Sequence, residues 1–201
     1  GGMSATLNRD FYTRTDVVRI ARELLGMVLV SEMDGIRTSG FITETEAYAG
    51  IGDRASHAFG GRRTARTEVM YAAGGTAYVY LCYGMHHLFN VVTHEAGTPH
   101  AILVRAMEPL EGIEAMRARR EGRPLRTGGP ALVSNALGIR TMHSGLDLIS
   151  GPIRIEDHGY RPLHASIMAG PRIGVDYAGA DALLPYRFRI APSPPSNRKR
   201  K

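Results

Sequence analysis

The apolar and polar positions of the chain follow two different periods, and their order predicts a mixed α/β fold. The residues from Met27 to Ser31 favour a strand, Asp34-Gly35 a turn, and Ile36 to Tyr48 a second strand. Before this hairpin, a helical period runs from a start signal at Thr15-Asp16 to Gly26, which fits a helix C-cap, with apolar residues at Val17, Ile20, Ala21, Leu24 and Leu25.

A second hairpin is predicted after a long loop. Ala49 to Thr67 is rich in glycine and arginine, and long loops in compact domains are often functional. The β-forming run from Ala77 to Cys82 leads to Tyr83-Gly84-Met85 as the tip, and Leu88 to Thr93 is the return strand. Proteins that open DNA from the minor groove insert such exposed side chains between base steps. For Tyr83, packing and insertion both stay open.

The rest of the pattern completes one domain. Further strands are expected at 101–107, 153–156, 172–175 and 186–190, and helices at 110–121 and 130–137. We therefore predict a mixed α/β (α+β) fold, in which residues 3–196 form a single domain with a curved, mainly antiparallel β-sheet, flanking helices and a protruding β-hairpin. Residues 197–201 are expected to be a basic disordered tail, with phosphate contact as its functional reading.

Composition narrows the class of partner. The chain of 201 residues carries a net charge of +6, and a basic protein attracts polyanions, so nucleic acid is the first partner to consider. Because Cys82 is the single cysteine and no long apolar run is present, we expect a reducing, cytoplasmic compartment and no membrane contact. The eight histidines show no tight spacing with aspartate or cysteine, so no metal site is expected.

Residues that could take part in catalysis or stack on a ligand lie on both predicted hairpins. Glu44, Glu46 and Tyr48 alternate along a strand and share one side, where a carboxylate beside rings can have a raised pKa and act as a general base. An exposed strand face is the plainer interpretation. Tyr78 and Tyr80 also share a face, for which core packing is the alternative. The only lysines are Lys199 and Lys201, so the rest of the chain holds no amine for Schiff-base chemistry.

At these residues the chain resembles the alkyladenine (3-methyladenine) DNA glycosylase family of the animal type. The likeness runs from about Phe11 to Pro194 and keeps its motifs in order. They are Glu44-Thr45-Glu46-Ala47-Tyr48, His57 with Gly60-Gly61-Arg62, Ala77 to Met85, Asn90, Leu103 to Gly112, Gly129-Pro130 and Arg172-Ile173-Gly174-Val175. The chain departs from the family at His86-His87 and at Ala191-Pro192. A chain of this length is expected to be a bacterial member.

The resemblance implies roles for these residues. Glu46 would activate water and Arg105 would help to hold it; the base pocket would consist of Tyr48, His57 and Tyr80, which sandwich the flipped base, and Asn90, which disfavours guanine. Tyr83 would fill the gap in the duplex with Met85 in support, and we expect Arg62 and Arg63 to meet phosphates.

The resulting prediction is a monofunctional DNA glycosylase of base excision repair. It would act as a monomer on double-stranded DNA containing damaged purines, associated with the nucleoid in a bacterium, without a cofactor and without lyase activity, because water is its nucleophile. One alternative is a non-catalytic nucleic-acid binding module of related fold, in which a carboxylate such as Glu46 has no use. Another is a nucleoside hydrolase for small molecules, which would need neither the basic loop nor an exposed Tyr83.

Overall fold

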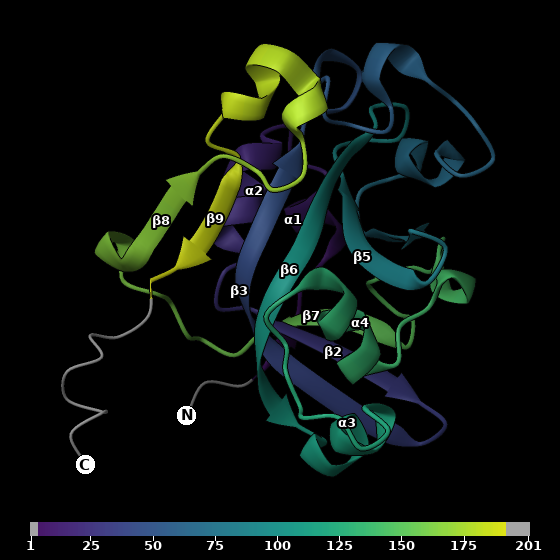
Figure 1. Ribbon diagram of the computed structural model, residues 1–201, viewed down its shortest axis with the longest axis vertical. Coiled ribbons are helices and arrows are strands. Elements are labelled where there is room, and N and C mark those ends of the chain that lie inside the picture. Colours follow the sequence, from purple (N-terminus) through teal and green to yellow (C-terminus); the bar gives the residue numbers. More distant parts are fainter. Residues whose placement is uncertain (1–3, 192–201) are drawn as a thin grey trace.

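A curved antiparallel sheet of nine strands organises residues 4–191, the part of the chain that the computed structural model describes (Figure 1). Its main path has the order β1-β7-β2-β3-β6-β5-β4, and β9 pairs with β3 and with the edge strand β8. The strands are β1 (Ala5–Thr6), β2 (Val28–Met33), β3 (Ile36–Tyr48), β4 (Thr76–Cys82), β5 (His86–Thr93), β6 (His100–Glu111), β7 (Ile153–Asp157), β8 (Ile167–Gly170) and β9 (Arg187–Ile190). The fold class predicted from the sequence is confirmed.

Strand β3 changes its partner halfway along. Its first half pairs with β2, and Glu44 to Glu46 pair with β9, while β6 follows β3 on the other side almost throughout. The register with β6 shifts between Ile42 and Thr45, where a β-bulge bends the strand. The second half of β3, which ends with Glu46 and Tyr48, therefore runs in a different direction from the half that pairs with β2, and β3 is curved in Figure 1.

Helices cover both faces of this sheet. Figure 1 shows α1 (Arg9–Tyr12) and α2 (Val17–Glu23) behind it and α3 (Ile113–Arg119) and α4 (Pro130–Leu137) in front. The side chain of Asp16 accepts a hydrogen bond from the Arg19 amide and so begins α2 with an N-cap. The hydroxyl of Thr45 donates to the Ala21 carbonyl at 2.8 Å, which fixes α2 to the rear face of β3. The 3-10 helices are η1 (Gly50–Gly52), η2 (Phe59–Gly61), η3 (Glu68–Tyr71), η4 (Thr141–His143), η5 (His164–Ser166) and η6 (Asp176–Leu183).

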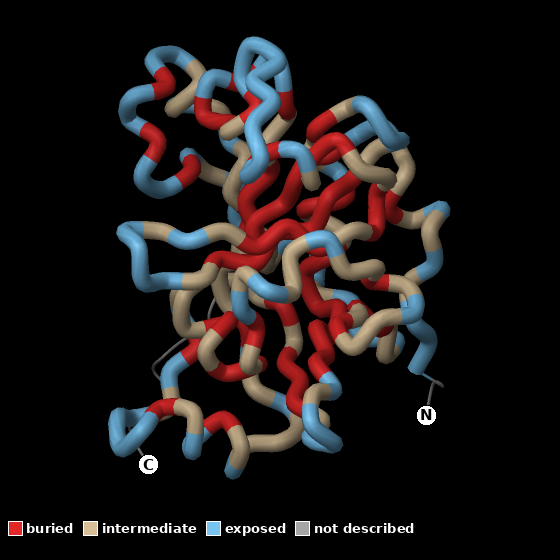
Figure 2. Tube along the Cα trace, turned by 90° about the vertical axis from the view of Figure 1, so that its right-hand side faces the viewer, coloured by how far each residue is buried: buried red, intermediate tan, exposed pale blue. Residues whose placement is uncertain are grey.

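Burial follows this layering. Figure 2 shows the buried segments gathered at the centre and the exposed ones at the outer loops. The main apolar cluster joins α2 to β2, β3, β5 and β6, and α4 adds Val133, Ala136 and Leu137 from the other face. Because β6 is covered on both sides, its residues from Ala101 to Val104 are all apolar and buried, without alternation.

Two predictions of secondary structure are wrong. Residues 172–175 form a loop rather than a strand, because the Arg172 side chain turns inward and Gly174 takes a positive φ of 74°; the strand lies just before, in β8. The helix predicted from Leu110 begins only at Ile113, because β6 continues to Glu111 and Gly112 takes the left-handed conformation that ends the strand.

Some expectations concern the ends of the chain. The predicted tail at residues 197–201, together with Pro192, lies outside the described residues. No helix within residues 4–191 is both long enough and apolar enough to cross a membrane.

Candidate active site

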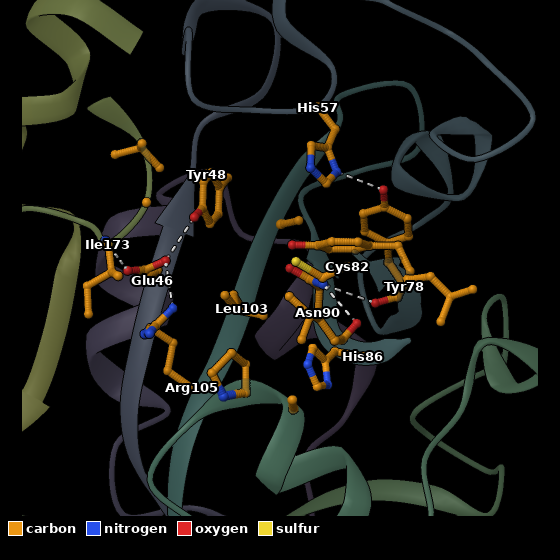
Figure 3. Close-up of a pocket in the computed structure, with 18 of the residues that line it drawn as sticks. Glu46, Tyr48, His57, Tyr78, Cys82, His86, Asn90, Leu103, Arg105 and Ile173 are labelled. Atoms are coloured by element: carbon orange, nitrogen blue, oxygen red, sulfur yellow. Dashed lines mark hydrogen bonds and ion pairs between the residues drawn. The ribbon is translucent and has the colours of Figure 1, made fainter. Parts of the chain in front are cut away.

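A cavity of about 550 Å³ opens where the ends of β3, β4, β5 and β6 meet the loop before β9. Figure 3 shows Glu46 and Arg105 on one side of it and Tyr78 and Asn90 on the other. The predicted residues that line it are Glu46, Tyr48, His57, Tyr80, Tyr83, Asn90 and Arg105. Segments that are distant in the sequence therefore meet at one site.

The carboxylate of Glu46 is completely buried in the wall of this cavity. The Tyr48 hydroxyl donates to its Oε1 at 2.8 Å, and the Ile173 amide donates to its Oε2 at 2.7 Å. Burial raises the pKa of Glu46 above its ordinary value, although Arg105 and the two hydrogen bonds oppose that change. Glu46 is therefore a fixed carboxylate with the enhanced basicity expected of a general base.

Arg105 lies beside this carboxylate and is held by a second one. Its Nη1 is 3.7 Å from Glu46 Oε1, and its Nε donates to Glu44 Oε2 at 3.0 Å. The Nε of Arg187 on β9 donates to the same Glu44 oxygen at 2.8 Å. Glu44, to which the sequence assigned no role, thus links Arg105 to β9 and fixes the guanidinium next to Glu46.

Aromatic rings form the opposite wall. The ring centroids of Tyr78 and Tyr80 are 5.4 Å apart, and Nδ1 of His57 is 2.9 Å from the Tyr78 hydroxyl. Burial, assisted by Arg66 and Arg62, lowers the pKa of His57 to about 4, so its imidazole is neutral at neutral pH.

The three rings of the predicted base sandwich all line the cavity. His57 meets the Tyr80 ring edge-on, with centroids 4.6 Å apart, so these two rings form one contact pair. Tyr48 lies beside Glu46, to which its hydroxyl donates (Figure 3). A base held between Tyr48 on one side and the pair of His57 and Tyr80 on the other would leave that pair in contact. The sandwich of Tyr48, His57 and Tyr80 stays a prediction.

Asn90 is buried at the cavity with its amide orientation fixed. Its Nδ2 donates to the carbonyls of Tyr78 and Leu88 at 3.2 and 3.3 Å. The amide oxygen receives no hydrogen bond from the described residues, so it can contact a ligand. His86 and His87, at which the chain departs from the family pattern, have different surroundings. His86 lines the cavity, and Nδ1 of His87 accepts a hydrogen bond from the Thr141 amide.

The tip of the hairpin formed by β4 and β5 presents Tyr83 and Met85 to solvent. Their exposed fractions are 91% and 67%, and only Tyr83 borders the cavity. Tyr83 and Gly84 have positive φ values of 53° and 69°, and the Met85 amide donates to the Cys82 carbonyl at 3.2 Å. The turn therefore holds the Tyr83 ring outward, as insertion into DNA would need.

The arginines of the loop from η2 to η3 are exposed, but their surroundings differ. Arg63 pairs with Glu68 at 2.9 Å and lies 4.3 Å over the Tyr71 ring. Arg62 is exposed, and its carbonyl accepts from the Tyr71 hydroxyl. Neither borders the cavity, so their predicted phosphate contact concerns the surface around it and stays a prediction.

Sequence reasoning missed the buried ion pair behind Tyr48. Arg172 donates to both carboxylate oxygens of Asp53, at 2.5 and 3.0 Å, and to the Ala47 carbonyl at 2.9 Å. Its guanidinium lies 4.9 Å from the Tyr48 ring centroid. Burial alone would raise the pKa of Asp53, but Arg172 and two backbone amides lower it below its ordinary value. Only the match of Arg172-Ile173-Gly174-Val175 marked this segment, without indicating its partner.

Within residues 4–191, no three histidine, cysteine, aspartate or glutamate side chains gather in a way that could hold a metal ion.

Comparison with known proteins gives consistent matches. A family model described as methylpurine-DNA glycosylase (MPG) matches residues 10–194. Proteins of Bacillus cereus (strain Q1) and Bacillus mycoides (strain KBAB4) are 45% and 46% identical over 184 residues, which is 86% of this chain and 90% of each relative. A protein of Desulfitobacterium hafniense (strain Y51) is 43% identical over 197 residues, 93% of this chain and 96% of the relative. All three bear the name "Putative 3-methyladenine DNA glycosylase".

Proposed function

The chain belongs to the methylpurine-DNA glycosylase family, and on this premise we propose that it removes alkylated or deaminated purines from duplex DNA by hydrolysis. The observation that carries the proposal is the buried Glu46 carboxylate at the wall of an aromatic cavity of about 550 Å³. A base within a duplex is out of reach, so the damaged nucleotide must rotate into this cavity, at a cost of a few kcal/mol.

Glu46 acts as the general base in this proposal. Its raised pKa brings the carboxylate closer to the basicity that removes a proton from water at neutral pH. The water then attacks the sugar carbon, and the bond to the base breaks. Because Glu46 has no solvent-exposed surface in the free protein, substrate binding must shift the Tyr48 hydroxyl or the Ile173 loop to admit this water.

Arg105 and the rings assist this step. The guanidinium of Arg105, held by Glu44, favours the ionised form of Glu46 and supplies donors for the water. Tyr48, Tyr80 and His57 provide ring faces for the base, and neutral His57 adds no positive charge beside it. Hydrolysis by water needs no amine nucleophile, in agreement with the absence of lysine before position 199.

The two other functions fit these features less well. A non-catalytic nucleic-acid binding module gains nothing from burying Glu46 inside a basic protein, since burial of a carboxylate is costly. A hydrolase of free nucleosides has no use for Tyr83, whose ring is 91% exposed at the rim of the cavity. Insertion of this ring into the space left by the flipped nucleotide accounts for both features.

The test is the substitution Glu46→Gln, which keeps the size of the side chain and an acceptor for the Ile173 amide. Duplexes carrying 3-methyladenine, 7-methylguanine, hypoxanthine or ethenoadenine are incubated with each protein, and base release and binding are measured separately. We expect the variant to lose base release and to keep its binding to damaged duplex.

The matched control is Glu108→Gln, which removes an exposed carboxylate from β6 outside the cavity. This control should release bases as the unmodified protein does. Full activity of Glu46→Gln would refute the role of Glu46. Absence of base release by the unmodified protein on all four duplexes would refute the function itself.

A further inference from the structure

Two tyrosines that line the cavity each carry an arginine on their ring. The guanidinium carbon of Arg172 lies 4.9 Å from the centroid of Tyr48, and that of Arg66 lies 5.3 Å from the centroid of Tyr80. Both distances are within the range in which a cation is attracted to the negative face of a ring. The two aromatic walls are therefore each in contact with a positive charge before any base enters.

The two arginines differ in how their charge is balanced. Arg172 is buried and bonded to both oxygens of Asp53, so a carboxylate offsets its charge at close range. Arg66 is exposed, lines the cavity and takes part in none of the ion pairs formed within residues 4–191. Arg66 therefore contributes a positive charge to the cavity that no bonded carboxylate offsets.

This charge acts on any base that contacts Tyr80. Rings in contact have centroids about 4.5–7 Å apart, so such a base lies within about 12 Å of the Arg66 guanidinium. At that distance and a dielectric constant of about 20, repulsion by Arg66 disfavours the entry of a positively charged base into the cavity about tenfold. Exposure of Arg66 and dissolved salt reduce the effect to about threefold under physiological conditions.

The same field already acts on a group inside the cavity. The pKa of His57 is lowered by burial and, after burial, by Arg66 and Arg62. A proton on His57 and a positive charge on a bound purine are similar perturbations, because both add a cation to the space beside Tyr80.

We propose that Arg66 is a specificity-determining residue that disfavours positively charged bases in the cavity and shifts excision toward neutral damaged purines. The proposal rests on the function proposed above. Purines alkylated at a ring nitrogen, such as 7-methylguanine, are cationic in DNA, whereas hypoxanthine is neutral. Arg66 therefore offsets part of the advantage that cationic bases have as leaving groups.

The test compares the rates of excision of one cationic and one neutral base. Duplexes that differ only in carrying 7-methylguanine or hypoxanthine are cleaved under single-turnover conditions by the unmodified protein and by Arg66→Gln. We expect the ratio of the two rate constants, 7-methylguanine over hypoxanthine, to rise about threefold in the variant, and more at low salt. Arg66→Lys keeps the charge and should keep the original ratio.

The matched control is Arg63→Gln, which removes one positive charge from the same loop but from a site over Tyr71, away from the cavity. It should slow both reactions equally, as loss of a phosphate contact would, and leave their ratio unchanged. An unchanged ratio in Arg66→Gln, or the same rise in Arg63→Gln, would overturn the role of Arg66. If the unmodified protein releases neither base, the proposed function fails instead, and the role of Arg66 fails with it.

Discussion

The turn at the tip of the β4–β5 hairpin offers a way to separate stability from DNA binding. Tyr83 and Gly84 both have positive φ values, a turn geometry for which Asn-Gly is the preferred pair. Because the Tyr83 ring is 91% exposed, the fold gains little from its burial. Tyr83→Asn should therefore stabilise the protein while removing the side chain proposed to enter the duplex.

The size of the gain follows from the backbone. The left-handed conformation costs a residue with a large side chain about 1–2 kcal/mol, and asparagine tolerates it better because its short amide bonds locally. We expect the free energy of unfolding of Tyr83→Asn to rise by about 0.5–1 kcal/mol. For a chain of this length the melting temperature should rise by about 1–4 °C.

Two measurements test the predicted stability and DNA binding of Tyr83→Asn. Urea and thermal denaturation give the stability, and the fluorescence of a base analogue in a duplex reports capture of the flipped nucleotide. Tyr83→Phe is the control, because it keeps both the ring and the backbone cost and should resemble the unmodified protein in both assays. A less stable Tyr83→Asn would contradict the backbone argument, and unchanged fluorescence would contradict insertion.

The remaining predictions concern Glu46 and the ion pairs around the cavity. Because burial raises the pKa of Glu46 in the folded state, ionisation of this carboxyl group destabilises the fold as the pH rises. The melting temperature of Glu46→Gln should therefore lie above that of the unmodified protein at about pH 8, and the difference should vanish at about pH 4. A difference that does not depend on pH would contradict this. Asp53→Asn leaves the Arg172 charge buried and unpaired, and urea denaturation should show a loss of about 3–5 kcal/mol, whereas Glu68→Gln, at an exposed pair, should stay close to the unmodified protein. Glu44→Gln frees Arg105 and should slow base release about tenfold in single-turnover assays with unchanged binding to damaged duplex; equal loss of both would indicate a purely structural role.

Parts of the site that depend on local sequence could be predicted. Glu46 and Tyr48 share a face because side chains alternate along a strand, and their hydrogen bond follows from that spacing. Tyr83-Gly84 marks the hairpin tip because glycine suits the conformation that such a turn requires.

The parts of the site that depend on contacts between distant residues could not be predicted from the sequence. The Ile173 amide meets Glu46 across 127 positions of sequence, and Asp53 meets Arg172 across 119, with no local pattern for either contact. Residues 172–175 are a short strand candidate in the sequence but a loop in the structure, where Arg172 turns inward. Burial of this guanidinium becomes tolerable only through Asp53, which the fold alone brings near.

The contact between Ile173 and Glu46 also bears on when the surroundings of Glu46, the proposed general base, are completed during synthesis on the ribosome. Once residue 111 has left the ribosome, β3 and β6 can pair, and Glu46 has Tyr48 and Arg105 as neighbours. The amide of Ile173 and the strand β9, which bonds beside Glu46, emerge only much later. Because the amino-terminal part of a chain emerges first, we expect the cavity of the nascent protein to lack its wall at Ile173, and Glu46 to be enclosed only when the segment that leads into β9 joins the sheet.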